Sequence, residues 1–207
     1  MPSLFELLYD PLARLFEPRG VRNGRALLVR DLAGEVLEVG AGTGANFRYY
    51  AAGARVTAID HSAYMVRRAR PRAEQAKAQI GVQQADVHAL PFEDGQYDHT
   101  VGTQVLCSVR EPERYLAEIR RVTKPGGSIR LIEHVRADGG WPLRLQSWVT
   151  PVWRLAFDGC HLNRDTLGLI RGAGFTIETV EDLGGMPLIR NKRIHARAPG
   201  SEGGAAE

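Results

Sequence analysis

The sequence is poor in cysteine, carries little excess charge and has no long apolar run. Cys107 and Cys160 are the only two cysteines among 207 residues, and their separation fits neither a metal-ligand spacing nor the disulfide framework of a secreted protein. We therefore expect no metal site and a reducing, cytoplasmic compartment. Lys and Arg outnumber Asp and Glu by 27 to 24, which is too small an excess to indicate nucleic-acid binding.

No segment is apolar for long enough to cross a bilayer, and the N-terminal residues lack the basic and apolar regions of a secretory signal. Hydrophobic residues make up 43% of the chain, so a chain of this length can bury a sizeable core. We expect a single domain over residues 1–198. Residues 199–207 are rich in Gly, Ala and Glu, and this composition predicts a disordered tail.

Short β-like runs alternate with helical patterns, which predicts an α/β fold with a mostly parallel sheet. The predicted strands are Glu35–Val39, Arg55–Asp60, Val82–Asp86, Tyr97–Thr103, Ile129–Val135, Phe175–Val180 and Lys192–Arg197. The predicted helices of the N-terminal region 1–31 are Leu4–Phe16 and Val21–Asp31. A further helix is predicted directly after a glycine-rich turn, and the remaining predicted helices are Ser62–Arg70, Glu111–Val122 and Asp165–Arg171.

The strongest motif is the glycine-rich segment Glu38–Gly44, with the sequence EVGAGTG. Glycines allow a sharp turn and a close approach to a ligand, and the N-terminus of a following helix would offer free N–H groups to a ligand carboxylate. Asp60 ends the next predicted strand, where an acidic side chain can hold both hydroxyls of a ribose. Asp86 ends the third predicted strand, where it could accept a hydrogen bond from an adenine amino group.

A nicotinamide-dependent dehydrogenase is the competing interpretation. Gly40, Gly42 and Ala45 also satisfy the dinucleotide fingerprint, with Asp60 about twenty residues further on. Against it, Gly44 gives the closer spacing G-x-G-x-G, Glu38 places an acid inside the strand before the turn, and the chain has little room for a separate substrate domain. A glycine turn that binds nothing would leave the acids at the ends of three successive strands unexplained.

Residues 136–164, between the fifth predicted strand and the last helix, contain all three tryptophans, Trp141, Trp148 and Trp153. We favour either a helical hairpin packed on the core or a lid over an acceptor site. A helix lying on a lipid surface is less favoured, because Arg144 and Arg154 alone form a weak polar face. Peripheral membrane contact stays open.

Five segments follow one another along the chain: Val36–Gly44, Val56–Asp60, Asp86–Phe92, Gln96–Asp98 and Arg121–Gly127. In order and spacing they resemble the successive motifs of the class I S-adenosylmethionine-dependent methyltransferases. The likeness is closest to the branch with the quinone-pathway C-methyltransferases. It implies a Rossmann-like sheet of seven strands, mostly parallel, with an antiparallel last strand and helices on both faces. It also implies S-adenosylmethionine as the cofactor, with S-adenosylhomocysteine as its product.

A narrower likeness is to the animal methyltransferase-like thiol methyltransferases, which act on small alkyl thiols. The segments that carry it are Gln104–Val109, Ile132–Val135 and Trp153–Thr166. The chain departs from that family at its N-terminus, because Glu6, Asp10, Pro11 and Arg14 interrupt the place where those enzymes carry a hydrophobic membrane anchor.

The resemblance implies a cofactor site made of residues that match the family motifs. They are Glu38, Gly40, Ala41, Gly42, Gly44, Asn46, Asp60, His61, Met65, Asp86, Val87, Gln104 and Cys107. In this assignment the glycine turn holds the methionine part of the cofactor, Asp60 binds the ribose, and His61 and Met65 flank the adenine. Gln104 and Cys107 lie between cofactor and acceptor.

Methyl transfer from a sulfonium is an in-line displacement with a neutral leaving group, so alignment and exclusion of water are its main requirements. A thiol with a pKa near ~8.5 ionises readily, whereas a hydroxyl or an ammonium acceptor needs a base. His134, at the end of the fifth predicted strand, is the candidate for base or acceptor orienter; a hydrogen-bonded strand-end histidine is an equal alternative. We interpret Cys160, beside His161, as a small buried residue in a tight turn.

The sequence therefore predicts a methyltransferase acting on a small molecule, with a thiol as the first acceptor. A phospholipid amine or a quinone-like ring carbon is the second acceptor class. The non-enzymatic alternative is a catalytically silent domain that binds the cofactor and serves as a partner subunit.

Overall fold

The computed structural model describes residues 17–186 and 188–200. The strands are β1 (Gly34–Val39), β2 (Ala54–Asp60), β3 (Gln79–Gln84), β4 (Tyr97–Thr103), β5 (Thr123–His134), β6 (Thr176–Asp182) and β7 (Asn191–Arg197). The helices are α2 (Arg19–Val29), the 3-10 helix η1 (Phe47–Tyr49), α3 (Ala63–Glu74), α4 (Pro112–Val122), α5 (Gly140–Ala156) and α6 (Thr166–Gly172). The predicted helix Leu4–Phe16 and residues 201–207 of the predicted tail lie outside the described residues.

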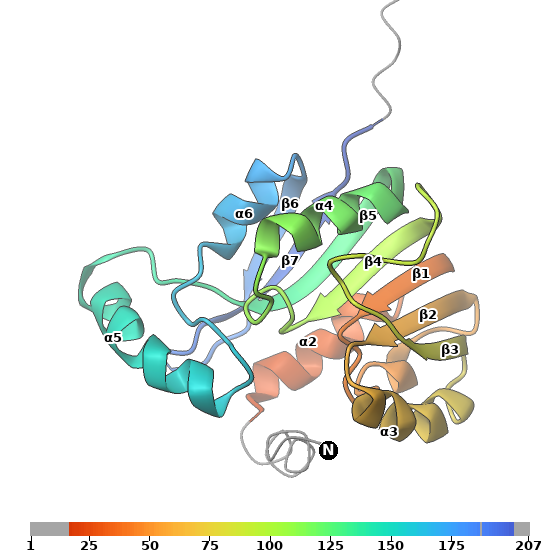
Figure 1. Ribbon diagram of the computed structural model, residues 1–207, viewed down its shortest axis with the longest axis horizontal. Coiled ribbons are helices and arrows are strands. Elements are labelled where there is room, and N and C mark those ends of the chain that lie inside the picture. Colours follow the sequence, from red (N-terminus) through yellow and green to blue (C-terminus); the bar gives the residue numbers. More distant parts are fainter. Residues whose placement is uncertain (1–16, 187, 201–207) are drawn as a thin grey trace, which may run out of the picture.

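The seven strands form one sheet with the order β3-β2-β1-β4-β5-β7-β6 (Figure 1). The first five strands pair in parallel, and β7 pairs antiparallel with both β5 and β6. The predicted mostly parallel sheet with an antiparallel last strand is thereby confirmed. Because β1 lies beside both β2 and β4, the chain reverses its winding direction there, and a crevice opens at the carboxyl ends of these strands.

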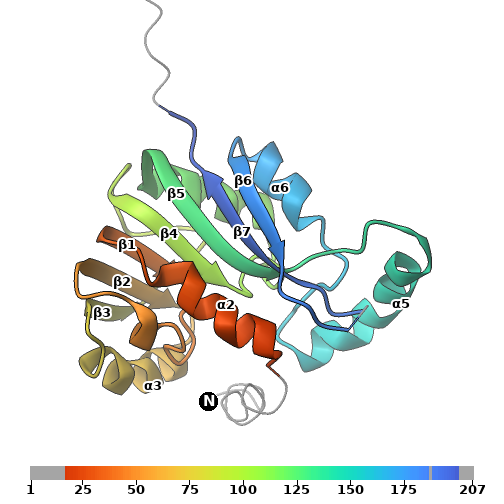
Figure 2. The same ribbon diagram turned by 180° about the vertical axis from the view of Figure 1, so that it is seen from behind.

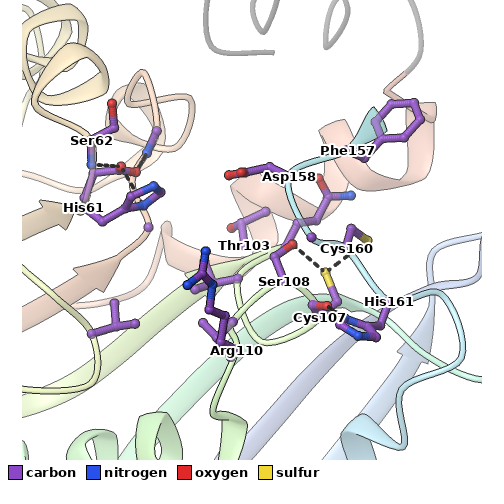
Figure 3. A pocket seen from close by; sticks show the side chains of 18 of the residues that line it. His61, Ser62, Thr103, Cys107, Ser108, Arg110, Phe157, Asp158, Cys160 and His161 are labelled. Carbon is purple, nitrogen blue, oxygen red and sulfur yellow. Dashed lines mark hydrogen bonds and ion pairs between the residues drawn. The ribbon is translucent and has the colours of Figure 1, made fainter. Parts of the chain in front are cut away.

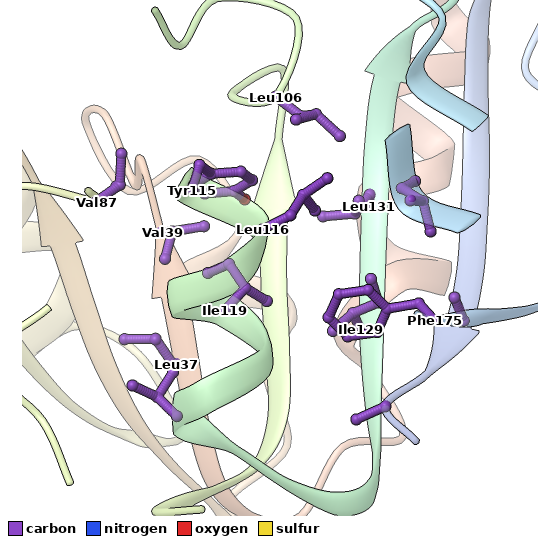
Figure 4. Packing of buried hydrophobic residues seen from close by; sticks show 14 of the residues in the cluster. Leu37, Val39, Val87, Leu106, Tyr115, Leu116, Ile119, Ile129, Leu131 and Phe175 are labelled. Atoms are coloured by element: carbon purple, nitrogen blue, oxygen red, sulfur yellow. The ribbon is translucent and has the colours of Figure 1, made fainter. Parts of the chain in front are cut away.

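Helices cover both faces of the sheet, and each face has its own apolar core (Figures 1 and 2). On one face, α4 and α6 pack on Leu37 and Val39 of β1 and on Ile129 and Leu131 of β5 (Figure 4). On the other, α2 and α3 pack with Val36 and Val56. This split follows from the strand period, since successive side chains point to opposite faces of the sheet.

Two predicted elements were wrong in ways that affect the site. The third strand begins and ends earlier than predicted, so Asp86 lies two residues beyond β3 rather than at its end. This edge strand has only Ile80 and Val82 as an apolar alternation, so its sequence signal is weak. The helix predicted after the glycine turn is reduced to the three residues of η1, because the backbone is already extended at Tyr50, with a ψ of 138°.

The strand after α4 is longer than predicted, since β5 begins at Thr123 rather than at Ile129. Residues Pro125–Gly127 lie inside it as an irregularity, across which the pairing with β4 shifts register. The predicted helix starts at Ser62 and Asp165 are capped: the Ser62 side chain accepts from the Met65 N–H at the start of α3, and Asp165 accepts from the Gly168 N–H at the start of α6.

Helix α5 carries its apolar side chains on its outer face. Trp148 is 86% exposed and Trp141 is 65% exposed, whereas the buried positions of this helix are the polar Gln146 and Thr150. Trp153 differs, because its ring stacks on Phe157 with centroids 3.9 Å apart. The prediction of a helical hairpin packed on the core was therefore wrong for the first two tryptophans. Among the described residues, no helix combines the length and the apolar character needed to cross a membrane.

Candidate active site

A cavity of about 890 Å³ opens at the carboxyl ends of the parallel strands. Gly40 and Gly42 of the glycine turn, Asp60 at the end of β2, Thr103 at the end of β4 and His134 at the end of β5 all line it. Its outer wall comes from the end of α5 and the loop that follows. In Figure 3, His61 and Ser62 lie on one side of the pocket, and Cys107 and Cys160 lie on the other. The pocket thus has two chemically distinct halves.

In the first half, Asp60 and the glycine turn are joined by hydrogen bonds. The Asp60 carboxylate accepts from the Gly42 N–H and from the Ser62 N–H, both at 2.9 Å, and its side chain is 8% exposed. Burial raises the pKa of Asp60, which these two backbone hydrogen bonds oppose. Each carboxylate oxygen keeps a lone pair, so Asp60 can still accept hydrogen bonds from a ligand's hydroxyls.

Gly40 makes a close backbone approach that no other residue type allows. A Cβ atom there would lie 2.4 Å from Val105 Cγ2, in the loop after β4. The bare backbone of the turn therefore forms the floor of the pocket.

Glu38 and Asn46 lie behind the glycine turn and do not line the pocket. Glu38 is 2% exposed, accepts from Asn46 Nδ2 at 3.0 Å and from the Tyr50 hydroxyl at 2.8 Å, and the Arg25 guanidinium donates to Asn46. Burial raises the pKa of Glu38 to about 7. These contacts hold the glycine turn from the side away from the pocket. Glu38 and Asn46 therefore support the turn and do not face a ligand in the pocket.

The remaining residues of the first half surround the opening beside β2 and β3. His61, Met65, Asp86 and Val87, which the resemblance assigns to the adenine, all line the pocket. Asp86 accepts from the His88 backbone N–H at 2.9 Å and contacts His88 Nδ1 at 2.8 Å, and these hydrogen bonds lower its pKa. Because its side chain is 67% exposed, its remaining lone pairs are accessible.

The structure brings together most of the predicted site residues. Those that line the pocket are Gly40, Gly42, Asp60, His61, Met65, Asp86, Val87, Gln104, Cys107 and His134. Those that do not are Glu38, Ala41, Gly44 and Asn46. The second group lies in or behind the turn that positions the first.

In the second half, a buried carboxylate fixes the loop that follows β4. Glu133 is fully buried and accepts from the backbone N–H groups of Val105, Leu106 and Cys107 at 2.8 to 3.0 Å. Burial raises the pKa of Glu133, against the effect of these hydrogen bonds. Just before this loop, Gln104 has a φ of 59°, a conformation that costs energy for a residue with a side chain and is common at functional sites.

Cys107, His134 and Cys160 form a buried cluster that faces the pocket. His134 Nδ1 lies 3.1 Å from Cys160 Sγ and 3.6 Å from Cys107 Sγ, and the two sulfur atoms are 3.6 Å apart. The sulfur–sulfur contact with Cys160 and burial raise the pKa of Cys107, while the same contact lowers the pKa of Cys160. Burial lowers the pKa of His134, but the contact with Cys107 outweighs it and the pKa is raised.

The sequence did not reveal that Cys160, Arg164 and His161 belong to this half. The predicted tight turn at Cys160 is present, with Asp158 and Gly159 both at positive φ and the Cys160 N–H donating to the Phe157 carbonyl at 2.9 Å. Arg164 donates to the carbonyls of Leu106 and Val109 and so ties the two pocket-lining loops together. No spacing signal could show these contacts, because they join residues more than fifty positions apart.

The strand order and the site together define a class of protein. The sheet order with an antiparallel β7 is that of the class I methyltransferase fold and differs from the six-stranded dinucleotide-binding order 3-2-1-4-5-6 expected of a dehydrogenase. The pocket volume is within the range of sites for ligands of cofactor size. A bare glycine turn and a carboxylate at the end of β2 suit the amino-acid and ribose parts of S-adenosylmethionine.

Comparisons with known proteins agree with this class. Residues 37–131 match a methyltransferase domain family. Human thiol S-methyltransferase TMT1A is 39% identical over 147 residues, which is 68% of this chain and 59% of that protein. The phosphatidylethanolamine N-methyltransferase of Cereibacter sphaeroides is 36% identical over 121 residues, 58% of this chain and 60% of that protein.

The fold is also found in a solved structure. The S-adenosylmethionine-dependent methyltransferase of Thermotoga maritima aligns with a TM-score of 0.69 and 21% identity, over 94% of this chain and 98% of that one. The chain spans about three fifths of the length of the two relatives named above. The chain belongs to the class I S-adenosylmethionine-dependent methyltransferases.

Proposed function

We propose that this chain transfers a methyl group from S-adenosylmethionine to the sulfur of a small thiol. The observation that carries the proposal is the two-part pocket, in which the glycine turn and Asp60 face a second half lined by Cys107, His134 and Cys160. The similarity to a thiol S-methyltransferase, 39% identical over 147 residues, supports the choice of acceptor.

The first half holds the cofactor in this proposal. Gly40 and Gly42 present backbone to its amino-acid part, and Asp60 accepts from the ribose hydroxyls. His61 and Met65 flank the adenine, while Asp86 and Val87 meet its edge. Glu38, Ala41, Gly44 and Asn46 act by keeping the turn in shape. Once bound, the cofactor supplies an electrophilic methyl group on a sulfonium.

The second half orients the acceptor and excludes water. Trp153 and Phe157 stack to form an apolar wall, which suits the alkyl part of a small thiol. Cys107 and His134 line the second half, so His134 can orient the acceptor's sulfur or accept its proton, and Gln104 lines the same pocket beside them. Exclusion of water matters because a desolvated thiolate is a better nucleophile and the main requirement is in-line alignment.

The most direct test supplies methyl-labelled S-adenosylmethionine with a small alkyl thiol, phosphatidylethanolamine or a quinol, and follows the label. We expect a labelled thioether and an equal amount of S-adenosylhomocysteine. Label in the lipid amine or the ring carbon would overturn the thiol acceptor and leave methyl transfer standing. Cofactor binding without product from any acceptor would indicate a silent domain.

Asp60→Ala tests the cofactor half. We expect cofactor affinity, measured by calorimetry, to fall at least about tenfold, since one charge-assisted hydrogen-bond acceptor is lost. Asp94→Ala is the matched control, because Asp94 is an exposed carboxylate that does not line the pocket. Equal affinities in both variants would contradict the ribose assignment.

The proposal places the protein in the cytoplasm, where thiols stay reduced. Both cysteines are free and buried, and a thiol cluster inside an active site needs a reducing compartment to persist. Fractionation of cells that produce the protein tests this location; recovery with a membrane fraction would contradict it.

A further inference from the structure

The buried cluster of Cys107, His134 and Cys160 has the composition and spacing of a metal site. The two sulfur atoms lie 3.6 Å apart, and His134 Nδ1 lies 3.6 Å and 3.1 Å from them. A tetrahedral zinc ion with Zn–S near ~2.3 Å and Zn–N near ~2.0 Å separates its sulfur ligands by about 3.8 Å and its sulfur and nitrogen ligands by about 3.5 Å. Shifts of a few tenths of an ångström would therefore close the site around an ion.

Each of the three ligands is held by its own contacts, so the cluster is formed before any ion binds. The Cys107 N–H donates to Glu133 at 3.0 Å, and the His134 carbonyl accepts from the Thr166 hydroxyl at 2.9 Å. The His161 N–H donates to the Cys107 carbonyl at 2.8 Å, which ties the segment that carries Cys160 to the segment that carries Cys107. Preorganised ligands bind a metal without a further ordering cost.

The second nitrogen of His134 has a partner that can fix its tautomer. Nε2 lies 3.4 Å from the Gln104 side-chain amide, which also contacts Asn191. With the amide oxygen of Gln104 turned toward Nε2, the Nε2–H donates to it and the lone pair of Nδ1 faces the two sulfurs. A matching exchange of the Asn191 amide brings its Nδ2 group, which has no partner among the described residues, into the position now held by its oxygen, from which it donates to Gln104. Such a second partner is typical of metal-binding histidines.

Charge and ligand type select the metal. Two thiolates and a neutral imidazole balance a divalent ion, so the loaded site adds no net charge to this buried place. Thiolate and imidazole ligands favour zinc over magnesium or calcium, which prefer oxygen. All three residues line the pocket, so the fourth coordination position faces the place where the acceptor binds. Three protein ligands and one open position are the arrangement of catalytic rather than structural zinc.

We propose that Cys107, His134 and Cys160 bind a zinc ion whose fourth position takes the sulfur of the acceptor thiol. This role rests on the proposed function. The acceptor's S–H bond breaks as its sulfur binds zinc, and the proton leaves to bulk water as the acceptor enters. The sulfur then forms a bond to the methyl carbon as the bond from that carbon to the cofactor's sulfur breaks. His134 acts here as a metal ligand and not as the base.

Metal content tests the site independently of activity. Protein purified under reducing conditions is loaded with zinc and dialysed, and its zinc content is measured by elemental mass spectrometry. A second sample is loaded with cobalt, and its absorption spectrum is recorded. We expect about one ion per chain, together with thiolate-to-cobalt charge-transfer absorption and the strong visible bands of tetrahedral cobalt. Cys107→Ser and Cys160→Ser should each remove both signals. His195→Gln is the control, since His195 lies on β7 and does not line this pocket.

Several results would overturn the site. One is the absence of metal from the reduced wild type, and another is metal retained in both cysteine variants. The third is a protein mass two hydrogen atoms below that of the fully reduced chain, which would show a Cys107–Cys160 disulfide under the same reducing conditions. The acceptor role has its own readout, because an alkyl thiol that binds the metal should shift the cobalt spectrum. An unchanged spectrum in a metal-loaded protein would overturn that role alone. If the ion binds but the thiol is never methylated, the proposed function fails and the metal site stands.

Discussion

At the scale of single residues, Glu38 shows how burial changes the role of a side chain. Its position inside β1 suggested a ligand for the cofactor, yet its carboxylate turns away from the pocket and accepts from Asn46 and Tyr50. Burial raises its pKa from 4.5 to about 7. The folded protein therefore binds this proton more tightly than the unfolded chain does.

The stability of the protein should depend on pH through Glu38. Because the folded pKa is the higher one, the contribution is fully present below about pH 4.5 and is lost as the pH rises through about 7. Glu38→Gln stays neutral, so its free energy of unfolding should rise relative to the wild type between about pH 5 and pH 8, by ~3 kcal/mol at most. Urea unfolding at both pH values measures this. Glu35→Gln, on the same strand with a side chain 38% exposed, controls for the loss of a carboxylate. A difference that does not vary with pH would contradict the prediction.

Residues of the glycine turn could be predicted from sequence because their requirement is local. A close backbone approach at Gly40 and an acid at the end of the next strand are properties of short segments. The pairing of Cys107 with Cys160 could not be predicted, because it depends on the loop after α5 folding back onto the loop after β4. Glu133 was missed for the same reason, since its three partners belong to a different segment.

At the scale of elements, α5 divides its tryptophans between solvent and the pocket wall. Trp148 is 86% exposed, whereas Trp153 stacks on Phe157. Trp148→Ser should therefore change the free energy of unfolding by less than ~0.5 kcal/mol. Trp153→Ala should cost about 2 kcal/mol, because it removes a packed aromatic contact. Thermal or urea unfolding of the two variants compares them directly. A large loss with Trp148→Ser would mean that this side chain is covered in solution.

Arg164 joins the loop after β4 to the segment after α5. Its guanidinium donates to the Leu106 and Val109 carbonyls and lies 3.0 Å from His161 Nδ1. Arg164→Ala should lower the free energy of unfolding by about 2 kcal/mol, because it leaves carbonyls without their donor. It should also raise the KM for the acceptor more than the KM for the cofactor.

Arg164→Lys tests whether charge alone is sufficient. A lysine keeps the positive charge but cannot reproduce the planar fork of donors, so we expect it to restore less than half of the lost stability. Full rescue by lysine would show that Arg164 acts through its charge, and equal effects on the two KM values would contradict its place on the acceptor side.

At the scale of the whole molecule, the order of strands is what assembles the site. The resemblance correctly predicted seven strands in a mostly parallel sheet with an antiparallel last strand, which strand periodicity alone could not supply. The bounds of the predicted third strand were wrong, because an edge strand has a weak apolar pattern. The helix predicted after the glycine turn is only the three residues of η1. The division of the pocket into two halves follows from the topology, since β1, β2 and β3 end on one side and β4 and β5 end on the other.

The measurement that tests this account most directly is a crystal structure of the protein with S-adenosylhomocysteine. We expect the ribose hydroxyls to bind Asp60, the amino-acid part to lie on the backbone of Gly40 and Gly42, and the cofactor's sulfur to face the cluster of Cys107, His134 and Cys160. A molecule bound elsewhere, or one whose sulfur faces away from that cluster, would contradict the account.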